Sequence, residues 1–152
     1  MKKHAILILM ICFTAVSLAQ NPNKTDESRI KELIIASFDE IWSQLNSKNI
    51  DKYYTKDFLL LENGEVWNND SISKYLNHAV LKKPIPKRVN SIEFIEVKVL
   101  NGMAWVAYKN KAVFTLENKP GRKALWLESA TAILTAAGWK LQMLHSTGLE
   151  NE

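Results

Sequence analysis

Two side chains with acid–base chemistry, Glu128 and His145, fall on the last two long apolar segments of the chain. Residues 139–146 alternate with period 2, which places three apolar side chains on the face that carries His145: Trp139, Leu141 and Met143. If the preceding turn is a two-residue loop, even positions before it share a face with odd positions after it. Glu128 then lies across from His145 or on its diagonal. Such a pair could move a proton to or from a ligand, with His145 as acid or base and Glu128 orienting it.

Two other interpretations of this pair stay open. Glu128 and His145 could satisfy each other, or backbone groups, at the rim of the fold. They could also line a ligand pocket that catalyses no reaction. Tyr54 and Trp67 join the candidates because their polar atoms need a partner when buried. The predicted ligand lining is Tyr54, Trp67, Trp126, Glu128, Met143 and His145.

The elements that must position these residues follow from periodicity and turn residues. Helical spacing of apolar residues from Ile30 to Leu45 predicts an amphipathic helix, capped by Thr25 or Asp26. Asn63-Gly64 predicts a tight hairpin, and Asp70 is expected to cap a second helix that runs to about Leu81. Four long β-rich segments with short breaks follow: Val89–Leu100, Met103–Leu116, Arg122–Thr135 and Trp139–Ser146.

This order of elements predicts an α+β fold, in which a curling antiparallel sheet packs on a long N-terminal helix; the cone shape of that curved sheet is implied by the family resemblance given below. The sheet face opposite the predicted pocket mixes apolar and polar residues, which suits either a homodimer interface or a half-exposed sheet. Its predicted members are Leu125, Leu127, Ser129, Thr131, Ile133, Lys140, Gln142, Leu144 and Ser146.

The N-terminal residues 1–19 have the pattern of a secretory signal peptide: Lys2 and Lys3, an apolar run, and Ser17-Leu18-Ala19. We therefore expect a secreted or periplasmic protein with a flexible leader at 20–27, a single domain at 28–149 and no stable membrane insertion after cleavage. The single cysteine, Cys12, lies in the signal, so the mature domain has no disulfide.

The charge balance predicts no nucleic-acid partner, because 18 basic residues face 16 acidic ones once the signal is removed. The densest basic stretch, Lys82–Arg88, is expected to be a solvated loop, with anion binding as the alternative. The mature histidines, His78 and His145, lie far apart in sequence and have no carboxylate at ligand spacing, so we expect no metal site. We expect no cofactor either, since no glycine-rich phosphate loop is present.

The order of elements from Ile30 to Gly148 resembles the nuclear transport factor 2-like superfamily. The ending, Trp139 followed by His145 and Ser146-Thr147-Gly148, is similar to the SnoaL-like and calcium/calmodulin-dependent kinase II association-domain branch. The resemblance implies a ligand site inside the cone and dimerisation through the sheet. Ketosteroid-isomerase-like members place a catalytic Asp near the early hairpin strand, where this chain has Phe58-Leu59-Leu60-Leu61.

Three functions therefore remain in view. The first is binding of a small, largely apolar ligand inside the cone, and the second is an acid–base isomerase, dehydratase or cyclase that uses His145 and Glu128. The third is a dimerising assembly domain without a ligand. A cavity inside the cone favours the first two functions, and a cone filled by side chains favours the third.

Overall fold

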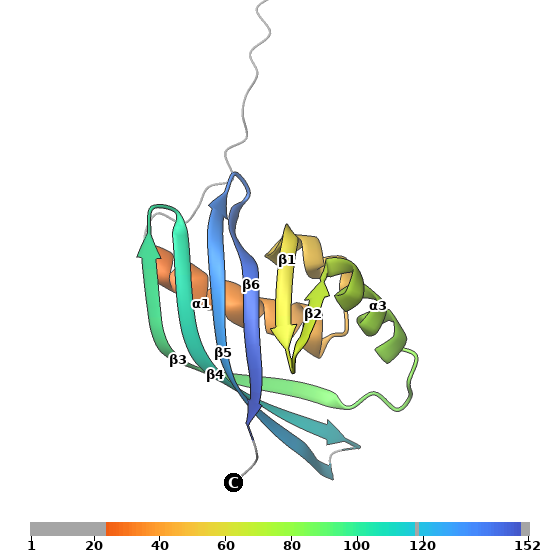
Figure 1. Ribbon diagram of the computed structural model, residues 1–152. Coiled ribbons are helices and arrows are strands. Elements are labelled where there is room, and N and C mark those ends of the chain that lie inside the picture. Colours follow the sequence, from red (N-terminus) through yellow and green to blue (C-terminus); the bar gives the residue numbers. More distant parts are fainter. Residues whose placement is uncertain (1–23, 118, 150–152) are drawn as a thin grey trace, which may run out of the picture.

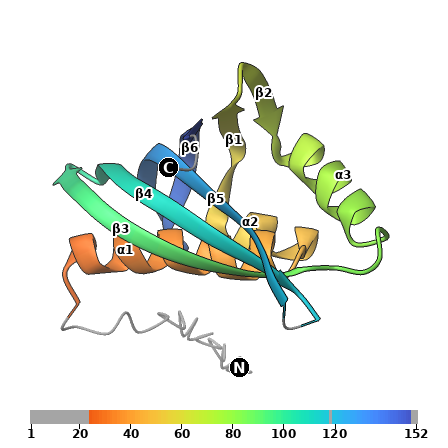
Figure 2. The same cartoon turned by 90° about the horizontal axis from the view of Figure 1, so that it is seen from below.

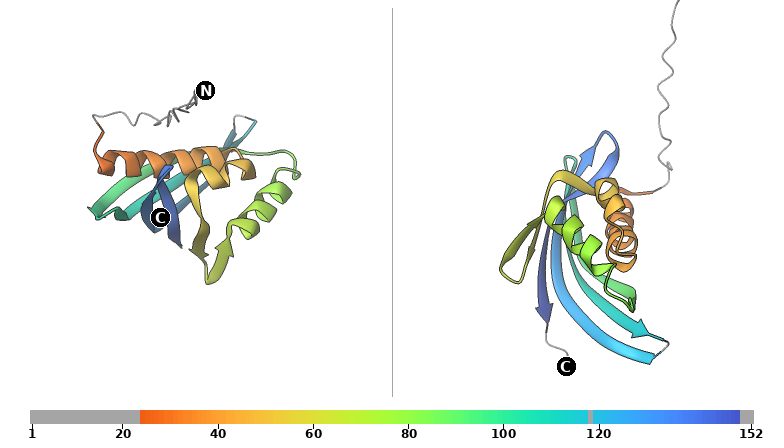
Figure 3. Two further views of the ribbon diagram at one scale, coloured as in Figure 1. Left: turned by 90° about the horizontal axis from the view of Figure 1, so that it is seen from above. Right: turned by 90° about the vertical axis from the view of Figure 1, so that its right-hand side faces the viewer.

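The computed structural model describes residues 24–117 and 119–149. One six-stranded sheet, in the order β2-β1-β6-β5-β4-β3, curves around the helices, which lie on its concave side (Figure 1; Figure 3, right). The strands are β1 (Tyr54–Glu62), β2 (Glu65–Asn68), β3 (Lys87–Leu100), β4 (Met103–Leu116), β5 (Lys119–Thr135) and β6 (Gly138–Leu149). The predicted α+β class and curved sheet are confirmed. The sheet is mixed, because β1 runs parallel to β6, while the other neighbouring pairs are antiparallel.

The helices are α1 (Asp26–Ser37), the π-helical η1 (Phe38–Ser43), the 3-10 turn η2 (Ser47–Asn49), α2 (Ile50–Tyr53) and α3 (Asn69–Ala79). Thr25 caps α1 as predicted, since its side chain accepts a hydrogen bond from the Ser28 N–H at 3.2 Å. The predicted cap of the second helix is wrong. Asn68 accepts the Ser71 N–H at 2.9 Å, so α3 starts one residue before Asp70. No helix among the described residues is long and apolar enough to span a membrane.

The tight turns form at the positions that the sequence analysis predicted. Asn63-Gly64 and Asn101-Gly102 all have positive φ, as a two-residue hairpin turn requires, and they join β1 to β2 and β3 to β4. The predicted signal peptide, residues 1–19, lies outside the described residues, as does the predicted leader up to residue 23. Helix α1 begins at Asp26, inside the segment 20–27 that was predicted as leader.

Helix α1 and η1 lie across the concave face of the sheet (Figure 2). The core lies between these helices and the sheet. From the helices, Ile30, Ile34 and Ile41 are fully buried. From the sheet they meet small or branched side chains that let the helix approach: Val106, Ala130, Ala132 and Leu141. This packing occupies one end of the cone and leaves the other end, between α3 and the tips of β3–β5, available for a pocket.

Candidate functional site in the cone

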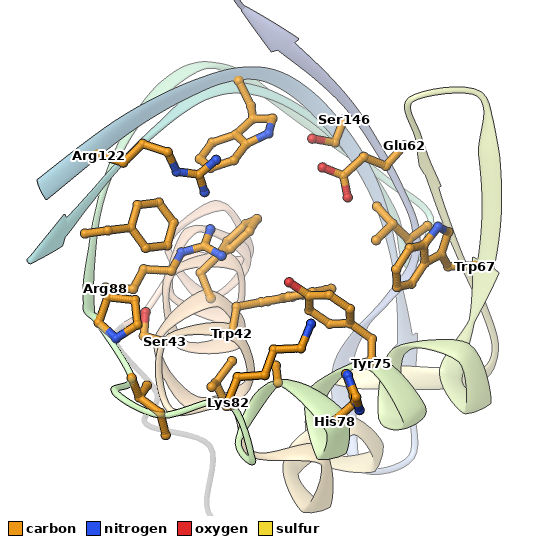
Figure 4. Close-up of a pocket in the computed structure, with 18 of the residues that line it drawn as sticks. Trp42, Ser43, Glu62, Trp67, Tyr75, His78, Lys82, Arg88, Arg122 and Ser146 are labelled. Atoms are coloured by element: carbon orange, nitrogen blue, oxygen red, sulfur yellow. The ribbon is translucent and has the colours of Figure 1, made fainter. Parts of the chain in front are cut away.

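A cavity of about 860 Å³ opens between η1, α3 and the concave face of the sheet. This volume suits a small organic ligand. Figure 4 shows its wall: Arg88 and Arg122 reach in from one side, Glu62 and Ser146 stand opposite, and Tyr75 and Lys82 lie at the edge formed by α3 and the loop after it. The cone is therefore not filled by side chains.

Aromatic rings make up one half of the wall. The Trp42 Nε1–H donates to the Tyr54 hydroxyl at 2.9 Å, and the Tyr54 ring stacks on Phe58 with 3.9 Å between centroids. Tyr75 bridges this group to the hairpin, because its ring centroid lies 6.3 Å from that of Trp42 and 5.5 Å from that of Trp67. The π-helical segment η1 brings Trp42 to the cavity. The resulting surface favours a planar or apolar ligand body.

Arg88 places a positive charge in the opposite wall. Its guanidinium carbon lies 5.7 Å from the ring centroid of Phe38, 5.6 Å from that of Phe114 and 5.4 Å from that of Trp126. Within the described part of the chain, no Asp or Glu oxygen lies within 4 Å of its guanidinium nitrogens. Burial lowers the pKa of Arg88 from its ordinary value, but a guanidinium in a protein keeps its proton at neutral pH.

A hydrogen-bond chain fixes the direction of Arg88. Its Nε donates to Asn90 Oδ1 at 2.8 Å, and Asn90 Nδ2 donates to Ser43 Oγ at 2.7 Å and to Asp39 Oδ1 at 3.3 Å. Strand β3 is thereby tied to η1 beside the cavity. With Nε engaged, the two terminal nitrogens form the outer fork of the guanidinium, the arrangement that matches a carboxylate.

Further cations surround the entrance, and burial raises the pKa of the carboxyls of the cavity. Lys82 and Arg122 line the cavity, and the Arg122 guanidinium carbon lies 4.7 Å from the Phe114 ring centroid. Burial raises the pKa of Glu62. Burial also raises the pKa of Glu128 from 4.5 to about 7, although the Ser146 hydrogen bond opposes this shift. The lining has three side chains that are cationic at neutral pH, Arg88, Lys82 and Arg122, against two carboxyls, Glu62 and Glu128.

The predicted pairing of Glu128 with His145 is wrong. The two-residue loop Ala136-Ala137 is present, and the predicted register holds as far as the pair Ala132–Leu141. The next pair is Thr131–Met143, so Gln142 is an extra residue, a β-bulge, and every later side chain of β6 changes face. Ser146 therefore lies across from Glu128, and its hydroxyl donates to Glu128 Oε1 at 2.8 Å.

The bulge divides the predicted ligand-lining residues into two groups. Tyr54, Trp67, Trp126 and Glu128 lie on the cavity wall. Met143 and His145 pair with Thr131 and Ser129 on the convex face, and His145 is exposed. The same inversion moves Leu144 and Ser146 from the predicted convex face into the cone, where both are buried.

Sequence reasoning missed Arg88 as a site residue, because Lys82–Arg88 was expected to be a solvated loop. Strand β3 starts at Lys87, and the alternation of its buried positions puts Arg88 on the same face as Asn90, Ile92 and Phe94. The alternation of side chains along Arg88–Phe94 would have been enough to predict this inward face of β3. Nothing local in the sequence indicated Arg122 or Phe114, which reach the cavity through the curvature of β4 and β5 (Figure 1).

No group of three or more His, Cys, Asp or Glu side chains positioned for a metal ion occurs in residues 24–117 and 119–149.

Comparison with known proteins identifies the fold. No protein-family model matches the chain, and no curated protein matches it. Among solved structures, a nuclear transport factor 2 (NTF2)-like protein from Cytophaga hutchinsonii is similar with a TM-score of 0.66 and 11% identity, over 83% of this chain and 100% of that chain.

Two further neighbours carry different functions in their names. The CaMKII hub of S. rosetta has a TM-score of 0.66 and 13% identity, over 83% of this chain and 98% of that chain. A ketosteroid isomerase-like protein from Erwinia carotovora atroseptica has a TM-score of 0.60 and 16% identity, over 80% of this chain and 95% of that chain. The predicted resemblance to the NTF2-like superfamily is confirmed as a likeness of fold, which does not specify an activity.

Proposed function

We propose that this NTF2-like domain binds a small organic anion with an aromatic or apolar body inside its cone. The observation that carries the proposal is Arg88, a guanidinium held among three aromatic rings in the wall of a cavity of about 860 Å³. The proposal sharpens the expected largely apolar ligand by adding an anionic group.

The physical argument rests on compensation of charge. A charge removed from water is costly unless an opposite charge or hydrogen bonds replace its hydration. Arg88 donates one hydrogen bond, to Asn90, and the rings of Phe38, Phe114 and Trp126 add the weaker cation–π attraction. Glu128 and Glu62 attract its charge from a distance, without forming an ion pair with it in the described residues. A carboxylate on the outer fork would supply two charge-assisted hydrogen bonds. Its aromatic or apolar body would then lie against Trp42, Tyr54 and Tyr75.

Phenylacetate, a minimal aromatic carboxylate, tests this proposal. We expect the wild-type protein to bind it, and Arg88→Met to bind it at least about tenfold more weakly, because a charge-assisted hydrogen bond contributes roughly 1.5–3 kcal/mol. Ligand-observed NMR titration at pH 7 measures both affinities. Lys87→Met is the matched control: it removes a neighbouring exposed cation of β3 whose side chain does not line the cavity.

If Arg88→Met and Lys87→Met lowered the affinity for phenylacetate equally, the loss would reflect only the lower net charge of the protein, and the proposal would fail. The acid–base pair predicted from the sequence does not form, since His145 lies on the convex face, where Glu128 cannot orient it.

A second candidate function, homodimer formation through the convex face, is favoured by exposed apolar side chains on β4 and β5. Trp105 is 44% exposed and Leu127 is 45% exposed, and no described helix covers that side of the sheet (Figure 3, right). Large apolar side chains exposed on one face of a sheet are typical of interaction sites. One structural neighbour is named a hub, which is consistent with assembly through this fold.

We expect the wild-type domain to form a dimer that Trp105→Lys and Leu127→Lys each convert to a monomer, because a lysine buried in an apolar interface has no partner for its charge. Light scattering coupled to size-exclusion chromatography measures the mass. Leu81→Lys is the control, since Leu81 is also apolar and is even more exposed, at 74%, but lies after α3, away from the convex face. A wild-type monomer at micromolar concentration would refute the dimer.

We also propose export of the protein. Support comes from the signal-peptide pattern of residues 1–19, which lie outside the described residues.

A further inference from the structure

Two arginines share one aromatic ring in the wall of the cavity. Arg88 of β3 pairs with Phe114 of β4, and its guanidinium carbon lies 5.6 Å from the Phe114 ring centroid. The guanidinium carbon of Arg122, on β5, lies 4.7 Å from the same centroid. The two guanidinium groups are therefore no farther apart than these two distances added together. All three side chains line the cavity.

A β-bulge holds Arg122 beside the Phe114 ring. The regular β4–β5 pairing is interrupted between Val113 and Thr115. There Gly121 and Arg122 of β5 stand opposite Phe114 alone. A Cβ on Gly121 would collide with the Phe114 carbonyl oxygen, so the two backbones approach each other as only glycine allows. The position of Arg122 is thus set by the strands themselves.

Neither guanidinium has a carboxylate partner. In the part of the chain that the structure describes, no Asp or Glu oxygen lies within 4 Å of the guanidinium nitrogens of Arg88 or Arg122. Both side chains point into the same part of the cavity, and Glu62 stands on the opposite side (Figure 4). Two like charges held close together repel each other, and an anion between them turns this repulsion into attraction. The two arginines therefore favour a ligand with two negative charges.

The arrangement of the strands decides how those two charges are distributed. A single carboxylate pairs with the outer fork of one guanidinium and leaves the other fork without an anion. Because Phe114 occupies the strand between the two arginines, two separate carboxylates reach the two forks more readily than one compact dianion such as a phosphate. We propose that Arg122 binds a second carboxylate, so that the ligand of the cone is a dicarboxylate with an aromatic or apolar body. This inference rests on the proposed function, since the first carboxylate of the same ligand lies at Arg88.

Phenylacetate and phenylmalonate, which differ by one carboxylate on the same carbon, test the second carboxylate site. We expect the wild-type protein to bind phenylmalonate about tenfold more tightly at pH 7, in line with hydrogen bonds between two charged groups. Arg122→Met should bring the ratio of the two affinities close to one. Lys111→Met is the matched control and should keep the wild-type ratio, because it removes an exposed cation of β4 whose side chain does not line the cavity. Ligand-observed NMR titration at a fixed ionic strength measures all these affinities.

The outcomes separate this inference from the proposed function. Equal wild-type affinities for the two probes would overturn the second carboxylate site and leave the Arg88 site intact, and this comparison needs no variant. A preference for phenylmalonate that survives in Arg122→Met, or that Lys111→Met removes equally, would also overturn it. Tighter binding of phenyl phosphate than of phenylmalonate would replace the dicarboxylate by a compact dianion. If the wild-type protein binds none of these probes at millimolar concentration, the proposed function fails and the second site fails with it.

Discussion

Replacing Glu128 by glutamine should abolish most of the loss of stability that the wild-type domain undergoes between pH 5 and pH 8. Burial raises the pKa of this carboxyl from 4.5 to about 7 in the folded protein. Below pH 4.5 the group is protonated in both states. Between pH 4.5 and about 7 the unfolded chain loses the proton while the folded chain keeps it, so the free energy of unfolding falls as pH rises. The expected loss is roughly 3 kcal/mol, from 1.36 kcal/mol for each pKa unit.

Urea unfolding at pH 5 and pH 8 measures this effect. Glu128→Gln should match the wild type at pH 5 within about 1 kcal/mol and exceed it at pH 8 by up to roughly 3 kcal/mol, since glutamine carries no charge to bury. Glu93→Gln, an exposed position on β3, should track the wild type at both pH values. Burial also raises the pKa of Glu62, so the free energy of unfolding of the Glu128→Gln variant should still fall with rising pH, but less steeply than in the wild type. Equal slopes in Glu128→Gln and the wild type would contradict the assignment of the pH dependence to Glu128.

Ile34→Ala should destabilise the domain by roughly 2–5 kcal/mol. Ile34 lies on the face of α1 that packs into the core, and its exposed fraction is 0%. Truncation removes buried apolar surface and leaves a cavity that the close-packed neighbours fill only in part. Thermal or urea unfolding measures the loss.

The adjacent residue provides a matched control on the same helix. Ile35 is 42% exposed, so Ile35→Ala should change the free energy of unfolding by no more than about 0.5 kcal/mol. Similar losses from the two substitutions would contradict the assignment of the stabilisation to the buried face of α1, since alanine favours the helix at both positions.

Local signals were sufficient to predict most of the fold. The helical spacing from Ile30 to Leu45 separates Ile34 from Ile35 without a structure, because only Ile34 continues the apolar stripe. Asn63-Gly64 and Asn101-Gly102 fix two hairpins through a backbone conformation that few other residues adopt. The parallel pairing of β1 with β6 joins residues about 85 positions apart, and no local pattern encodes it.

The candidate site was harder to predict, for two physical reasons. A β-bulge has no strong sequence signature, so the inversion at Gln142 was invisible and exchanged His145 for Ser146 beside Glu128. Arg88 belongs to a run whose prolines and lysines favour a loop, and its burial depends on three rings from η1, β4 and β5. Four residues of the cavity wall could be predicted from the sequence. Alternation along the strand predicted Trp126 and Glu128, and the polar atoms of their rings indicated Tyr54 and Trp67.

Gln142 lets the domain take up a change in chain length without changing its interior. Deleting that residue would make Ala132–Leu141 and Thr131–Met143 successive pairs of an uninterrupted β5–β6 ladder, so Ser146 would stay across from Glu128 and His145 would stay on the convex face. The deletion variant should therefore keep the carboxyl–hydroxyl pair, and NMR contacts between Ser146 and Glu128 would reveal it. In this fold a β-bulge can absorb an inserted residue while the side chains that face the cavity remain the same.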